Sequence, residues 1–218
     1  MIEEDVIAIF PLPNLVFFPK TNLPLHIFEP RYCEMVKETI RNKQLIGMFL
    51  LQPGWQEDYY GNPPVFSVGC AGEMIHVEEL AEGKFNIVLR GLYRARAMGT
   101  VQEFPYRKAR VQVLPEIVNN DTKSKRAVKQ LLSDYQKLTK ENEALESPDL
   151  VNSNDLQEVV NSIATNLHLE TDFKMELLQE NDVLLRARSV HELIKKHLSV
   201  YDWTRPFTHL RPDDPTQN

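Results

Sequence analysis

Cysteine is scarce in this sequence, and no stretch is apolar enough to cross a membrane. The two cysteines, Cys33 and Cys70, form no C-x-x-C pair and are too few for a fold held by disulfides. Apolar runs are always interrupted before they reach the length of a membrane-spanning helix, and the N-terminal MIEEDV lacks the basic start of a secretory signal. We therefore expect a cytoplasmic protein that does not use a membrane, with both thiols as small core residues.

An excess of positive charge and recognisable catalytic motifs are also lacking. The formal net charge of −6 argues against a surface built to hold a nucleic-acid backbone. Gly83-Lys84 does not belong to a phosphate-binding loop, because Phe85 follows it and Glu78 stands where the first glycine should be. The sequence contains neither G-x-S-x-G nor H-E-x-x-H. We expect no catalytic residue, no metal ligand and no cofactor. An enzyme with an unrecognised site is the least favoured hypothesis.

What the sequence does contain is an apolar stretch rich in proline, FPLPNLVFFPKTNLPLHIFEPRY (10–32). Its five prolines each remove a backbone donor and fix φ, so the stretch cannot form a continuous helix. It must consist of short extended pieces joined by rigid turns, with the apolar side chains in a core. Pro30 can begin a helix, because the first helical position needs no donor. The pattern predicts a helix over 30–42, with Met35, Val36, Thr39 and Ile40 on one face.

Composition changes near residue 118, because ten of the 14 prolines and all eight glycines precede it. The first part predicts short strands at 6–10, 23–28, 44–51, 66–77, 84–89, 94–101 and 107–114. Gly69 and Gly72 suggest bulges, and Glu82-Gly83 suggests a hairpin turn. The segment 44–51 is apolar enough for a strand covered on both sides, and Arg90 precedes an expected turn. Strands of this length and spacing favour a closed or nearly closed barrel.

The second part predicts a bundle of three or four amphipathic helices. An apolar stripe of helical period runs from Leu156 to Leu167, and similar stripes mark helices within 128–138, 173–178 and 183–198. Asn154 and Asn181 are the expected N-caps of two of these helices. The predicted fold class is α+β, with a barrel domain over 1–118, a helical domain over 119–202 and a polar tail over 203–218.

The chain resembles the N-terminal domain of the Lon protease family. The resemblance covers roughly residues 5–198 and rests on FPLPNLVFFP (10–19), LPLHIFEPRY (23–32), IGM (46–48), VGCAGEMIHV (68–77), EGKFNIVLRGLYRARA (82–97) and IATNLHLETDFKMELLQENDVLLRARSVHEL (163–193). It implies a PUA-like barrel with one covering helix, followed by a helical bundle. It also implies a version that stands alone, because the ATPase and protease parts of a Lon protease would have to follow and the chain stops at residue 218.

The Lon resemblance implies a module that is not an enzyme and that binds unfolded or exposed polypeptide segments, or a protein partner. We expect an apolar groove between barrel and bundle to admit such segments with low sequence demand. Nothing in the sequence chooses between adaptor, decoy and scavenger roles. The expected oligomeric state is a monomer or a weak homodimer.

Aromatic side chains supply the candidate contacts for a peptide. Trp55, Tyr59 and Tyr60 lie in a polar loop, where large aromatics often contact partners. The alternative is that they fold back and cap the barrel. Phe17 and Phe18 are further candidates, with a core position as the favoured alternative.

Arginines offer a second hypothesis, binding of RNA or another anion. Arg94 and Arg96 share one face of a strand, and Arg90, Arg107 and Arg110 lie close to them in the sequence. PUA-like barrels elsewhere bind RNA, but fold analogy alone is a weak argument, and solvated or salt-bridged arginines are the favoured alternative. Arg31, in the first turn of the predicted helix, is expected to pair with a carboxylate or with carbonyl groups. Its alternative role is to anchor an anionic ligand.

Overall fold

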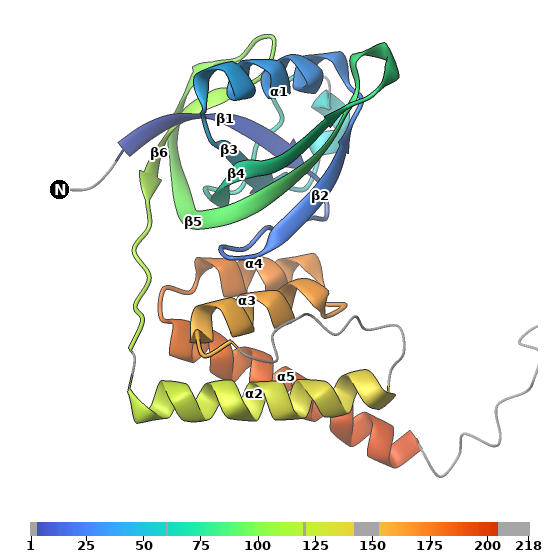
Figure 1. Ribbon diagram of the computed structural model, residues 1–218, viewed down its shortest axis with the longest axis vertical. Helices are drawn as coiled ribbons and strands as arrows, with labels where there is room; N and C mark the ends of the chain where they lie inside the picture. The colour runs from blue at the N-terminus through green and yellow to red at the C-terminus, as the bar shows by residue number, and fades with distance from the viewer. Residues whose placement is uncertain (1–3, 60, 120, 142–152, 205–218) are drawn as a thin grey trace, which may run out of the picture.

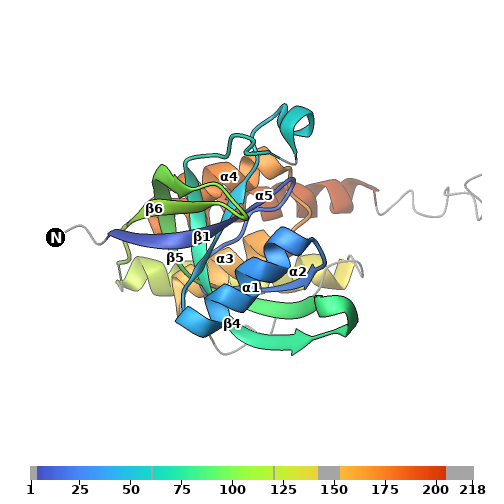
Figure 2. The same ribbon diagram turned by 90° about the horizontal axis from the view of Figure 1, so that it is seen from above.

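A computed structural model describes residues 4–59, 61–119, 121–141 and 153–204. The chain folds into a strand-rich unit with one helix, followed by a helical unit packed against it (Figure 1). The helix α1 (Pro30–Asn42) lies across one end of the strands, and the helical unit covers the opposite end. Seen from above, α1 crosses over the strands (Figure 2). In the part of the chain that the structure describes, no helix has the length and apolar character to span a membrane.

Six strands form one sheet, which closes on itself. They are β1 (Glu4–Leu12), β2 (Asn22–Ile27), β3 (Ile46–Leu50), β4 (Val68–Glu79), β5 (Phe85–Gln102) and β6 (Lys108–Val113). Their order is β2-β5-β4-β3-β1-β6, and a further pairing of β5 with β6 closes the ring. The β1–β3 pair is parallel and the others are antiparallel. The α+β prediction is confirmed. The ring is not a regular barrel, because β2 lies outside it.

The strand β5 replaces two strands that the sequence predicts as separate. The prediction of a turn after Arg90 is wrong, because the chain continues through Gly91 as one strand. The strand has a bulge where it pairs with Ala71 and Gly72 of β4. A Cβ atom at position 91 would lie 2.2 Å from the carbonyl oxygen of Phe18. Gly91 is therefore needed for close approach between two segments and not for a turn.

Two small cores fill the strand unit. One contains Met35 and Val36 of α1, and the fully buried side chains of the other come from β1, β3, β4, β5 and β6. Residues 7–10 of β1 alternate between these cores, and every residue of β3 is buried, as predicted for a strand covered on both faces. Ile40 is wrongly predicted on the buried face of α1, because it is 46% exposed. Cys33 and Cys70 are buried free thiols.

Among the described residues, four helices form the second unit, and an aspartate caps each of two of them. The helices are α2 (Thr122–Glu141), α3 (Leu156–Asn166), α4 (Thr171–Gln179) and α5 (Val183–Thr204). Asp155 accepts from the amides of Gln157 and Glu158, and Asp182 accepts from the amide of Leu184. The predicted caps Asn154 and Asn181 are therefore displaced by one residue. A carboxylate accepts these bonds and also suits the positive end of the helix dipole. The helix α5 continues to Thr204, past the predicted boundary at 202.

Replacement of the cap by Asp155→Ala should lower the free energy of unfolding by about 1 kcal/mol at neutral pH. Burial disfavours the charged Asp155, but Lys20 and the Glu158 and Gln157 amides outweigh it and lower its pKa. A carboxylate with a lowered pKa stabilises the fold above its unfolded pKa, and this contribution is lost as the pH falls through the folded value. Urea unfolding at pH 7 and at about pH 2.5 measures this loss. The difference in unfolding free energy between the variant and the wild type should be smaller at the acidic pH. Asn154→Ala is the matched control, and a larger loss there than at Asp155 would contradict the assignment.

Candidate functional site

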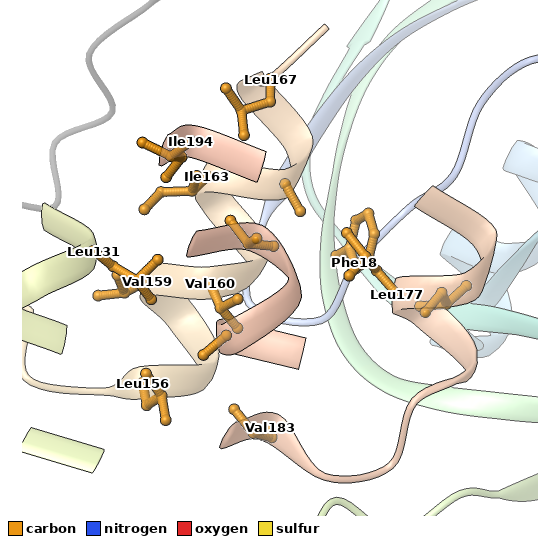
Figure 3. Close-up of a cluster of buried hydrophobic side chains, with 14 of the residues drawn as sticks. Phe18, Leu131, Leu156, Val159, Val160, Ile163, Leu167, Leu177, Val183 and Ile194 are labelled. Atoms are coloured by element: carbon orange, nitrogen blue, oxygen red, sulfur yellow. The ribbon is translucent and has the colours of Figure 1, made fainter. Parts of the chain in front are cut away.

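Among the described residues, apolar side chains of both units meet at the junction where the apolar groove is expected. Phe18, Leu50 and Val68 of the strand unit are buried in the same core as the inner faces of the four helices. Figure 3 shows Phe18 pointing at Leu177 of α4. The cavities seen among the described residues are each lined by one unit alone. The predicted groove is wrong because apolar side chains of both units meet there and exclude a ligand.

Two predicted peptide contacts are part of this interior. Phe18 has no exposed surface, and Phe17 is buried in the core beneath α1. Their predicted role as surface contacts is contradicted, and the alternative of a core position holds. The segment that carries them is fixed to the helical unit, because the carbonyl of Pro19 accepts a hydrogen bond from the side chain of Asn161 on α3.

A buried network of two arginines and one carboxylate also crosses the junction. Arg94 of β5 donates from Nε to Glu116 at 2.7 Å, and Arg186 of α5 donates from Nη2 to the same carboxylate at 3.0 Å. Both arginine side chains have no exposed surface. Arg94 also donates to the Asn181 side chain and to backbone carbonyls at the C-terminal end of α4, and Arg186 donates to Asn161. The prediction that Arg94 lies on an exposed basic face is wrong, because the helical unit covers it.

The other four arginines do not form a single surface. Arg96 and Arg110 are exposed, and the β5–β6 register places Arg96 opposite Gln112, two residues from Arg110. Arg90 lies beyond the bulge, opposite Glu73. Arg107 is half-buried and lines a cavity that none of the other three arginines lines. The structure therefore brings together only two of the five predicted arginines, and nothing in it favours RNA over another partner.

The polar loop after β3 carries an aromatic cluster held by Arg31. Trp55 and Tyr59, at the two ends of the short helix η1 (Trp55–Asp58), pack edge to face with ring centroids 5.5 Å apart. Arg31 donates to Glu29 at 3.1 Å and to the carbonyl of Tyr59 at 3.3 Å, as its predicted structural role requires. The Tyr59 hydroxyl donates to Glu29 at 2.8 Å, and burial together with this carboxylate raises the pKa of Tyr59. Tyr60, the third predicted aromatic contact, lies outside the described residues.

A cavity of about 60 Å³ opens between this loop and the β5–β6 hairpin. Tyr59, Asn62 and Pro63 line it from the loop, and Phe104 and Arg107 line it from the hairpin. Tyr59 thus lines the cavity, and Trp55 packs against Tyr59. Tyr32 also lines the cavity, and burial raises its pKa to about 12. Its hydroxyl group therefore stays uncharged at neutral pH.

The hairpin contributes exposed apolar residues that the sequence reading missed. Met98, Val101 and Phe104 are 54, 50 and 71% exposed. The first two fall inside a predicted strand, where alternation alone does not tell which face meets water. The available signal was Phe104 beside Pro105, an aromatic at a turn between two strands. We call Trp55, Tyr59, Met98 and Phe104 the aromatic–hairpin surface.

Comparisons with known proteins agree with this architecture. A family profile described as the ATP-dependent protease La (LON) substrate-binding domain matches residues 6–196. Lon protease 2 of Myxococcus xanthus is 27% identical over 205 residues, which cover 91% of this chain and 25% of that protein. Lon protease of Parabacteroides distasonis is 28% identical over 190 residues, which cover 84% of this chain and 23% of that protein. The chain spans about a quarter of the length of these relatives.

Solved structures share the same fold. The N-terminal domain of the Mycobacterium avium complex Lon protease has a TM-score of 0.69 at 17% identity, covering 88% of this chain and 100% of that one. A Lon N-terminal domain protein from Xanthomonas campestris has a TM-score of 0.62 at 19% identity, covering 85% of this chain and 96% of that one. Because the family profile matches most of its length, the chain belongs to the Lon substrate-binding domain family.

Proposed function

We propose that this chain binds exposed apolar segments of polypeptides at the aromatic–hairpin surface and acts through binding without catalysis. The observation that carries the proposal is Phe104, an aromatic side chain that is 71% exposed at the mouth of a cavity. Membership in a family described as substrate-binding supports recognition of a polypeptide as the task of the domain.

The surface has the composition expected for recognition with little sequence demand. Trp55 and Tyr59 are amphipathic rings, and each loses little conformational entropy on binding. Met98 is unbranched and polarisable, so it adapts to side chains of different shape. Met98 and Phe104 line two neighbouring cavities that share Arg107, so one extended segment can contact both residues. A surface of adaptable apolar groups suits unfolded clients that share no motif.

A client test separates this surface from the rest of the molecule. The wild-type protein should slow the aggregation of reduced insulin, followed by light scattering, and Phe104→Ala should remove most of that effect. The reductant leaves the covalent structure unchanged, because Cys33 and Cys70 are free thiols. Truncation of an exposed side chain should leave the fold intact, with a change in stability within about 0.5 kcal/mol.

The matched control is Phe28→Ala, because Phe28 is also highly exposed, at 60%, but follows β2 and lines a different cavity from Phe104 and Met98. It should slow aggregation as well as the wild type does. Equal losses for both variants would point to nonspecific adhesion of exposed rings. No effect of the wild-type protein at all would remove the proposal.

A further inference from the structure

Arg107 differs from the other shielded arginines because it has no acidic partner among the residues that the structure describes. Among the described residues, Arg31 is paired with Glu29, and Arg94 and Arg186 share Glu116. Arg107 donates from Nε to the side-chain oxygen of Asn62 at 3.3 Å and from Nη2 to the carbonyl of Pro63 at 2.9 Å. Both acceptors are neutral. In the part of the chain that the structure describes, no carboxylate lies within ion-pair distance of this guanidinium.

The surroundings of Arg107 leave its charge incompletely balanced. Burial lowers the pKa of Arg107, and repulsion from Arg31 lowers it further. Tyr32, Glu103 and Asp58 act in the opposite direction without reversing the shift. A half-buried cation that meets only neutral acceptors has lost hydration without gaining a counter-charge. A carboxylate arriving from outside would make a charge-assisted hydrogen bond there.

The shape of the cavity restricts what that carboxylate can belong to. Its volume of about 60 Å³ suits a carboxyl group and its neighbouring carbons but not a folded element. Tyr32, Tyr59 and Phe104 supply aromatic walls, and the exposed ring of Phe104 stands at the opening. An apolar side chain next to the carboxylate in a ligand would therefore meet Phe104.

We propose that the cavity binds a carboxylate of the client polypeptide through Arg107, beside an apolar residue that packs on Phe104. The carboxylate comes from the C-terminus of the client or from an aspartate or glutamate side chain. This inference rests on the proposed function, since it assigns a chemical preference to the same surface.

Four acetylated peptides measure this preference by isothermal titration calorimetry. GSGSALF with a free C-terminal carboxylate is compared with GSGSALF amide, and GSGSALFD amide is compared with GSGSALFN amide. We expect a carboxylate to strengthen binding about tenfold in at least one pair, as a charge-assisted hydrogen bond does. The first pair reports a chain end and the second an acidic side chain.

In the variant Arg107→Gln, the ratio of the two dissociation constants within that pair should fall to about twofold or less. The affinity for the uncharged peptide should stay as in the wild type. If the substitution merely loosened the loop, both peptides of the pair would weaken by the same factor, which would overturn the assignment. Arg110→Gln is the matched control, because Arg110 lies on β6 just after Arg107, is exposed and does not line the cavity. Its ratio should stay near tenfold.

The outcomes separate this inference from the proposed function. Equal binding of charged and uncharged peptides, weakened alike by Phe104→Ala, would overturn the carboxylate site and leave the aromatic–hairpin surface standing. Absence of binding by all four peptides, with aggregation of reduced insulin unaffected, would overturn both.

Discussion

Glu116→Gln should lower the free energy of unfolding by about 3–5 kcal/mol, the usual cost of removing one partner from a buried ion pair. Glu116 is the carboxylate shared by Arg94 and Arg186, whose side chains have no exposed surface. Glutamine keeps the shape but offers one acceptor oxygen, so one arginine would face an amide that is itself a donor. The carbonyl groups around Arg94 satisfy its hydrogen bonds without balancing its charge. Urea unfolding followed by circular dichroism measures the loss.

The control for this substitution is Glu82→Gln in the exposed pair with Lys84. The Glu82 side chain is 76% exposed, so its removal should cost less than about 1 kcal/mol. A loss at Glu116 as small as that at Glu82 would mean that water reaches the network and screens it. In that case the junction would be held mainly by its apolar core and by the hydrogen bond from Asn161 to the Pro19 carbonyl.

The network also shows what the sequence could predict and what it could not. The strand carrying Arg94, the helix carrying Arg186 and the α+β class all follow from local periodicity and from turn residues. Burial of Arg94 does not, because it depends on where the helical unit docks, and its partners lie on segments far along the chain. From sequence alone, an arginine at an outward strand position predicts a basic surface. The prediction fails where a second unit packs over that face of the sheet, as it does at Arg94.

The candidate site was predicted in part for a similar reason. Trp55 and Tyr59 are recognisable because large aromatics in a polar loop are unusual, and the structure places Tyr59 at a cavity with Trp55 packed against it. The sequence alone does not link Phe104 to Arg107, because no pattern marks Phe104 as a contact and Arg107 falls among other arginines of a predicted basic face. What residue spacing does not contain is the meeting of the β5–β6 hairpin with the loop of Tyr59 and Asn62, which together line the cavity.

Phe18→Ala should also lower the free energy of unfolding by about 3–5 kcal/mol, the range found when a buried phenylalanine is truncated. Phe18 has no exposed surface and lies in the core that joins the strand unit to the helices. Removing the ring leaves a cavity opposite Leu177 (Figure 3). The cavity cannot collapse freely, because the carbonyl of Phe18 is held by Thr21 and that of Pro19 by Asn161. The measurement is the midpoint of urea unfolding with its slope.

Two comparisons distinguish a core phenylalanine from a peptide contact. Phe18→Leu keeps most of the apolar volume and should cost less than about half as much as alanine, so the loss should scale with the cavity. Phe104→Ala should do the reverse of Phe18→Ala, weakening client binding while stability stays within about 0.5 kcal/mol of the wild type. If Phe18→Ala were instead neutral for stability and harmful to binding, the ring would have to leave the junction in solution. The interface between the two units would then be an opening through which a client enters.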